Sequence, residues 1–151
     1  MSSKILFYDP MIINFPVDDT TAIAKGDMLA LSSGKAIPAA SVTWNTSLAQ
    51  TQTDMAAAFL GVADSAKIAS DGQTTIRVAT RPVVEFDCAS ATFSLMDKVG
   101  AAKQSGNALE NQKVAAVANV AYAIGRVYQN YASATTKVKV MVKSLLYGAM
   151  S

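Results

Sequence analysis

The chain has no histidine and a single cysteine, Cys88, among its 151 residues. Without histidine it cannot build a Ser-His-Asp or Cys-His catalytic arrangement or a metal site with imidazole ligands. One cysteine cannot form a disulfide within the chain or a cysteine-rich zinc site. Neither a P-loop nor a Gly-x-Gly-x-x-Gly fingerprint occurs. These absences predict a protein that is not an enzyme and that uses no cofactor and no metal.

Charged residues are also scarce, at 16%, and their net charge is +2. The sequence has no long run of like charges, so nothing indicates a tail that binds nucleic acid. No apolar stretch approaches the roughly 18 residues of a membrane span. The apolar run after Met1 is too short for a signal peptide. We therefore expect no nucleic-acid partner, no membrane partner and synthesis in a cytoplasm.

Apolar residues are abundant, at 51% of the chain. A chain of this size buries about 70% of its unfolded surface, which is enough for one core. Its apolar runs are short and are separated by glycine, serine and aspartate, a pattern typical of strands and turns. The sequence predicts an all-β fold: a small β-barrel or sandwich of short hairpins, with at most short helical turns.

The strand signals begin near residue 28. Two apolar runs, 28–31 and 35–38, flank a Ser-Ser-Gly turn and predict a hairpin. Further strands are expected at 59–63, 74–80 and 83–88, with a tight turn at Asp71-Gly72. The polar stretch 41–54 reads as a loop, followed by a helical turn at 54–58 that Asp54 would cap.

The second half of the chain repeats this order of elements. Runs at 98–102, 113–118, 123–127 and 135–140 resemble those at 27–31, 35–40, 59–63 and 74–78. We interpret 21–151 as a single β-barrel-like domain with two pseudo-repeated units, 21–88 and 92–148. The alternative is that any two hairpin-rich stretches look alike. Residues 114–124 also fit helical spacing, although we favour a strand at 113–118.

The last strand has the clearest pattern. Val138, Val140 and Val142 alternate with Lys137, Lys139 and Lys143 in position along the chain, with Met141 on the lysine side. Alternation with a period of two directs valine to a core and lysine to water.

Residues 1–20 carry several large apolar side chains but also Pro10 and Pro16. The prolines disfavour a helix, and the apolar residues disfavour a free tail. We expect an extended N-terminal arm that lies on its own domain or on a neighbour by adding a strand. The predicted partner-binding residues are Phe7, Tyr8, Ile12, Ile13 and Phe15 of this arm, with Trp44 in the polar loop as a possible anchor or plug.

A few residues could carry chemistry. Glu85 and Asp87 lie two residues apart on a strand and could form a carboxylate pair, but a solvated strand face explains them more simply. The Asp18-Asp19-Thr20 segment could bind a cation, although turn chemistry accounts for it. Cys88 follows an apolar strand and is expected to be a buried, inert thiol.

The Lys25-Gly26-Asp27 turn before an apolar strand is also found in lipoyl and biotinyl carrier domains. The Met-Lys-Met tripeptide of biotinyl domains is absent here, which disfavours that comparison.

The same segment resembles the phage capsid decoration (cement) protein family. The pieces that carry the resemblance are Lys25-Gly26-Asp27 with its apolar strand, Gly34 to Ala40 including Pro38-Ala39, and Phe59-Leu60-Gly61-Val62-Ala63. The resemblance covers about residues 22–80. It implies a β-barrel protein on the capsid exterior of a tailed-phage virion, which stabilises the shell. Its partner would be the major capsid protein, and it would form a homo-oligomer, a trimer.

A second function is kept open by the aromatic residues. A receptor-binding or glycan-binding β module on a virion or cell surface would use Trp44, Tyr122, Tyr128 and Tyr131 as stacking groups.

Overall fold

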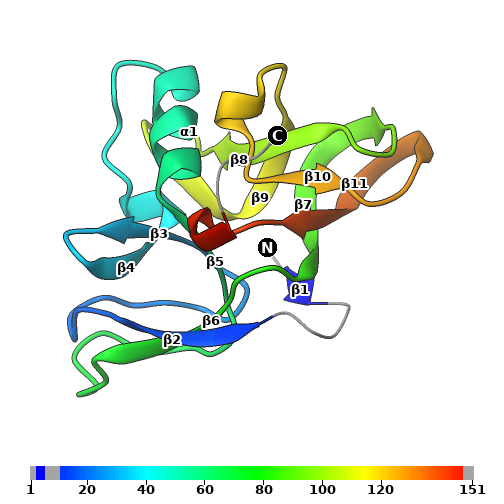
Figure 1. Cartoon of the computed structure of the whole chain (residues 1–151). Coiled ribbons are helices and arrows are strands. Elements are labelled where there is room, and N and C mark those ends of the chain that lie inside the picture. The colour runs from blue at the N-terminus through cyan, green and yellow to red at the C-terminus, as the bar shows by residue number, and fades with distance from the viewer. Residues whose placement is uncertain (1–2, 6–10, 148–151) are drawn as a thin grey trace.

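A computed structural model describes residues 3–5 and 11–147 of the chain (Figure 1). The described residues are mostly in strands, with one α-helix and three short 3-10 turns. The prediction of an all-β fold is therefore confirmed. The strands are β1 (Lys4–Ile5), β2 (Ile12–Pro16), β3 (Met28–Ser32), β4 (Lys35–Pro38), β5 (Phe59–Ala63), β6 (Thr75–Ala79), β7 (Val83–Phe93), β8 (Lys98–Lys103), β9 (Leu109–Ala116), β10 (Gly125–Val127) and β11 (Tyr131–Val142).

The strands form two sheets. The first has five strands in the order β2-β6-β5-β3-β4, and the second has six in the order β1-β7-β11-β10-β8-β9. A parallel pairing of β7 with β9, at Asp87 with Lys113 and Cys88 with Val114, closes the second sheet into a barrel. In Figure 1 the first sheet occupies the lower left of the molecule and the second the upper right.

The two sheets share one topology. Adding five to each strand number of the first sheet gives β7-β11-β10-β8-β9, the order of the second sheet without β1. The registers correspond as well: Met28 pairs with Val62 as Lys98 pairs with Arg126. Ile13 pairs with Val78 as Val84 pairs with Val140. We call β2 to β6 the first unit and β7 to β11 the second unit.

The unit boundaries differ from the predicted 21–88 and 92–148. Strand β2 is the first strand of the first unit, and β7, which the sequence pattern placed in the first unit, opens the second. Residues 12–16 of the predicted arm therefore form a strand that pairs with β6 of the same chain. The predicted end of the arm at residue 20 does not coincide with the end of this strand at Pro16. The second unit is entered directly after Pro82, because β7 begins at Val83.

Corresponding positions inside the two units carry apolar side chains. Phe15, Leu29, Leu60 and Val78 of the first unit match Phe86, Val99, Ile124 and Val140 of the second. The first set belongs to one buried cluster and the second set to another. Alternation with a period of two makes these the inner faces of the strands.

The outer face of the first sheet is also apolar. Met28, Phe59 and Val62 are essentially inaccessible, and they belong to the same cluster as the interior of the second unit. Met55 of the helix joins this cluster. One of the two clusters therefore spans both units, whereas the other fills the interior of the first unit.

The helix α1 (Leu48–Ala57) is the main element that the sequence pattern missed. The predicted loop at 41–54 holds for residues 42–47 but is wrong from Leu48 on. The predicted cap at Asp54 is wrong, because Ser47 caps the helix by accepting a hydrogen bond from the Gln50 amide at 3.2 Å. The expected helical turn at 54–58 is the end of this helix. The strand predicted at 113–118 is confirmed for residues 113–116, which belong to β9, and helical geometry in that region is limited to a 3-10 turn at Val120–Tyr122.

Two glycines occupy corresponding places in the two units. A Cβ at Gly61 would overlap the carbonyl oxygen of Ala79 and crowd Val78, and a Cβ at Gly125 would overlap the carbonyl oxygen of Met141 and crowd Val140. Gly61 also has a φ of +144°, which side chains rarely adopt. Each strand therefore approaches its neighbour closely at the same point of the fold.

We predict that Gly61→Ala and Gly125→Ala each lower the free energy of unfolding by about 1–3 kcal/mol or more, because backbone must move to admit the methyl group. Gly106→Ala is the control, since nothing lies within 4 Å of its added Cβ. Urea unfolding followed by circular dichroism measures all three. Unchanged unfolding midpoints for Gly61→Ala and Gly125→Ala would contradict the close approach.

Candidate functional site

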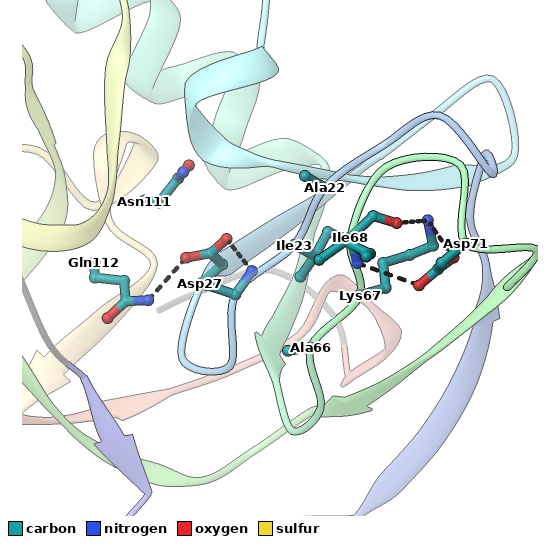
Figure 2. Close-up of a pocket in the computed structure, with 10 residues that line it drawn as sticks. Ala22, Ile23, Asp27, Ala66, Lys67, Ile68, Asp71, Asn111 and Gln112 are labelled. Atoms are coloured by element: carbon teal, nitrogen blue, oxygen red, sulfur yellow. Dashed lines mark hydrogen bonds and ion pairs between the residues drawn. The ribbon is translucent and has the colours of Figure 1, made fainter.

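A groove of about 810 Å³ follows the junction of the two units (Figure 2). Two loops of the first unit, at 22–27 and 66–71, form most of its wall, and Asn111 and Gln112 of β9 form the rest. Most of the lining is apolar, from Ala22, Ala24, Ala66 and Ile68. Ile68 is 74% exposed, which is unusual for an isoleucine. The groove therefore offers apolar surface beside a few fixed polar groups.

Gln112 joins the two units at this groove. Its amide nitrogen donates to the carbonyl oxygen of Lys25 at 3.1 Å and to a carboxylate oxygen of Asp27 at 2.9 Å (Figure 2 shows the second bond). Its amide oxygen accepts from the Ser3 amide at 2.8 Å. Gln112 and Asp27 are both almost fully buried. A buried glutamine with its polar atoms paired holds the 24–27 turn firmly against β9.

The turn itself is closed by Asp27. Its second carboxylate oxygen accepts from the Ala24 amide at 2.9 Å, and its own amide donates to the Ala24 carbonyl oxygen at 3.1 Å. One carboxylate oxygen of Asp27 therefore closes its own turn, and the other accepts a hydrogen bond from Gln112 of the second unit.

Lys67 is the most buried charge of the groove, with a fully covered side chain. Its ammonium group donates to the carbonyl oxygens of Asp19 and Thr21 at 2.8 Å each and lies 3.2 Å from the carboxylate of Asp71. The pKa of Asp71 is lowered, first by a hydrogen bond from the Gln73 amide and also by Lys67. A buried ammonium is tolerated only when it is paired in this way. Lys67 therefore ties two loops together and is not an accessible reactive amine.

The second unit has a corresponding cleft of about 500 Å³. Its lining residues Phe93, Ser94, Asp97 and Tyr131 match Ile23, Ala24, Asp27 and Lys67 of the groove. Phe93 pairs with Tyr131 as Ile23 pairs with Lys67. The lining of this cleft contains no residue of the first unit. The groove beside the first unit is therefore lined by residues of both units, whereas the corresponding cleft is lined by residues of the second unit alone.

A third surface lies on the outer face of the second unit. Arg81, Arg126, Met141, Lys143 and Tyr147 surround a shallow depression of about 470 Å³, and Arg81 stacks on the Tyr147 ring at 5.6 Å. Lys98 pairs with Arg126 on the neighbouring strand. We call Arg81, Lys98, Arg126 and Lys143 the basic face.

The predicted partner-binding residues divide into three groups. Phe7 and Tyr8 lie outside the described residues. Ile12 is 36% exposed on β2, whereas Phe15 packs against the inner cluster of the first unit and Ile13 shares its face of the strand. Trp44 is half-buried, and the Lys103 ammonium group lies 5.6 Å from its ring centre. Of the described residues in the predicted set, Ile12 offers the most exposed surface.

The simpler interpretation of the carboxylates agrees with the structure. Asp87 forms an ion pair with Lys137 at 2.6 Å, which raises the pKa of Lys137, and Glu85 lies opposite Lys139. Asp18 accepts hydrogen bonds from the hydroxyl and amide of Thr20, which lower its pKa to about 2. These groups have local structural partners.

Cys88 and the possible metal ligands likewise give no indication of a reactive site within the described residues. Cys88 is buried, and this burial raises the pKa of its thiol. No three of the Cys, Asp or Glu side chains in the described part of the chain gather as a metal site would require. No helix among residues 3–5 and 11–147 has the length and apolar character to cross a membrane.

Two tyrosines of the glycan-binding alternative differ in how accessible they are. Tyr131 packs edge-on against Phe93 with ring centres 6.3 Å apart, and its hydroxyl accepts from the Lys139 amide at 2.9 Å. Tyr128 is 40% exposed at the end of β10.

Sequence reasoning missed Gln112 because its partners lie far away along the chain, and it missed Lys67 because its carbonyl partners at Asp19 and Thr21 do so too, although Asp71 is only four residues away. A signal for the turns was present: an aspartate occurs at position 27 before one strand and at position 97 before the corresponding strand.

Comparison with known proteins gives no further guide: no family model, no curated protein and no solved structure matches this chain.

We predict that Gln112→Glu destabilises the protein at neutral pH, because its carboxylate would face that of Asp27 across a buried contact. The folded variant would then bind a proton that the unfolded chain does not hold at pH 7. Stability lost at pH 7 is therefore regained as the pH falls toward 5. Thermal unfolding across this pH range measures the effect. The exposed Gln50→Glu is the control, and an equal response of both variants would contradict the proposed lock.

Proposed function

We propose that this protein is a structural virion protein that binds the outer surface of a tailed-phage head and stabilises the capsid shell, without catalytic activity. Its partner would be the major capsid protein, and it would act as a trimer. Two findings support a binding role. The segment that resembles the capsid decoration family, 25–63, supplies β3, β4 and β5 of the first unit. The polar side chains of Gln112, Lys67 and Asp87 serve internal contacts rather than a reactive constellation.

The observation that carries the proposal is a difference between equivalent surfaces of the two units. Met28 and Val62 lie on the outer face of the first sheet, where the shared core covers them. The equivalent pair in the second unit is Lys98 and Arg126, both partly exposed. The outer sheet face is therefore buried in the first unit, whereas the equivalent face of the second unit is partly exposed and positively charged.

The charge of the open surface fits an acidic partner. The basic face carries four positive charges, and the whole chain has a net charge of +2, so the rest of the chain carries 2 − 4 = −2. Opposite charge on a partner favours docking in one orientation and speeds association. Each contact needs only modest affinity, because many copies act together on a shell.

The test is binding to assembled shells of the major capsid protein encoded in the same genome. We expect the protein to co-sediment with these shells and to raise the temperature at which they release their contents. Binding should weaken with added salt, since the contact is exposed and charged. Absence of the protein from the shell fraction at low salt would contradict the proposed function.

The role of the basic face has its own test. Arg126→Glu with Lys143→Glu should abolish co-sedimentation and leave the unfolding temperature within a few degrees of the parent protein. The control is Lys4→Glu with Lys25→Glu, which makes the same charge change at exposed positions away from the basic face. If both double variants bind equally well, the basic face is not the contact.

A further inference from the structure

The 24–27 turn of the first unit and the 94–97 turn of the second are built alike. The Asp97 amide donates to the Ser94 carbonyl oxygen at 3.0 Å, and the Ser94 amide donates to the Asp97 carboxylate at 2.8 Å. The matching bonds in the first unit measure 3.1 and 2.9 Å. Gly26 and Met96, at the third position of each turn, both have positive φ angles, of 95° and 72°. Because the two turns share one backbone conformation, a contact made by one of them indicates a contact that the other can make.

The two turns differ in what covers them. Gln112 donates to the Lys25 carbonyl oxygen and to Asp27, and Ser3 covers Gly26 so closely that a Cβ there would overlap it. The corresponding acceptors, the Leu95 carbonyl oxygen and the free oxygen of Asp97, receive no hydrogen bond within the described residues. The first turn is docked on the other unit, whereas the second is held by Arg126, which donates to the Met96 carbonyl oxygen at 3.0 Å, and by Asn130, both of its own unit.

The open turn carries apolar side chains where the docked turn has Lys25 and Gly26. Leu95 is 51% exposed and Met96 is 47% exposed. A methionine with positive φ is strained relative to glycine, by about 1 kcal/mol or more. The second unit therefore has a strained backbone at the position where it exposes the apolar side chain of Met96. Such exposed apolar residues mark contact sites rather than turn stability.

The surface that would receive this turn follows from the topology. Within the chain, the 24–27 turn docks on β9, and the strand that corresponds to β9 in the first unit is β4. The hairpin tip at 32–35, where β4 begins, is exposed, and Leu31 beside it is 39% exposed. In Figure 1 this hairpin lies at the left of the molecule and the end of β7, which leads into the 94–97 turn, lies at the right. A chain cannot bring these two ends together, but two chains can.

We propose that the protein self-associates head to tail, with the 94–97 turn of one copy docking on the β3–β4 hairpin of a second copy. Leu95 and Met96 contact Leu31 and the start of β4, as the 24–27 turn contacts β9 within one chain. The contact joins different surfaces of two copies, so it closes into a ring or extends into a filament. This contact deepens the homo-oligomer part of the proposed function but requires no capsid.

The first test measures association of the full chain in solution by sedimentation velocity across a concentration series. We expect the parent protein to form trimers. Met96→Gly with Leu95→Ser should raise the concentration of half-association at least about tenfold, because two apolar anchors are lost. This variant restores glycine at a positive φ, so its unfolding temperature should not fall, and any loss of association is not a loss of fold. Ile68→Ser, which removes the most exposed isoleucine of the groove, is the control and should associate like the parent.

The second test distinguishes a head-to-tail contact from a symmetric one. In a background with Cys88→Ala, a mixture of Met96→Cys and Lys35→Cys proteins should form cross-linked pairs with a short thiol cross-linker. Neither variant alone should do so. Cross-linking of Met96→Cys with itself would overturn the head-to-tail contact, and a parent protein that stays monomeric at every concentration would overturn self-association. Co-sedimentation with shells is read separately, so failure here and failure of capsid binding are distinguishable.

Discussion

The structure depends on the burial of one outer sheet face. In most small β-barrels the outside of each strand is solvated, but Met28, Phe59 and Val62 face outward from the first sheet and are covered by the core of the second unit. Burying three such side chains contributes several kcal/mol, at about 1.5–3 kcal/mol each. The second unit has Lys98, Ala123 and Arg126 at the corresponding positions. The two units therefore cannot exchange roles, and the chain has one closed junction and one open equivalent of it.

Polar contacts fix the geometry of that junction. Apolar burial is not directional, whereas Gln112 requires Lys25 and Asp27 to sit at defined distances. Asp27 meets the requirement only because its other oxygen closes its own turn. The same turn in the second unit keeps Asp97 for closure and has Leu95 and Met96 at its surface. The same turn conformation therefore makes a buried polar contact in the first unit and exposes apolar side chains in the second.

The sequence predicted those parts of the fold that a short window encodes. Val138, Val140 and Val142 alternate with lysines, and a period of two admits only a strand with one buried face. Helix α1 was missed because its polar Gln and Thr residues resemble a loop, and because the serine that caps it lies seven residues before the aspartate taken as the cap. The unit boundaries were missed because the strand expected at 83–88 follows the first-unit strands along the chain, whereas its main pairing partner, β11, lies about 50 residues further on. Gln112 could not be assigned a role, since its partners lie 85 and 87 residues away.

The comparison of the units separates what the fold requires from what it permits. Inner positions such as Leu60 and Ile124 stay apolar in both, because a polar side chain there would be buried without a partner. Gly61 and Gly125 stay without a Cβ, because the neighbouring backbone occupies that space. Lys98 and Arg126 on the outer face of the second unit are partly exposed and free of both constraints, and substitutions at such positions change stability little. The first unit requires apolar Met28 and Val62 on its outer face, because the shared cluster covers them. The second unit tolerates Lys98, Arg126, Leu95 and Met96 at its surface. They are the places where two copies of one architecture can acquire different contacts, one with an acidic surface and one with another copy of the chain.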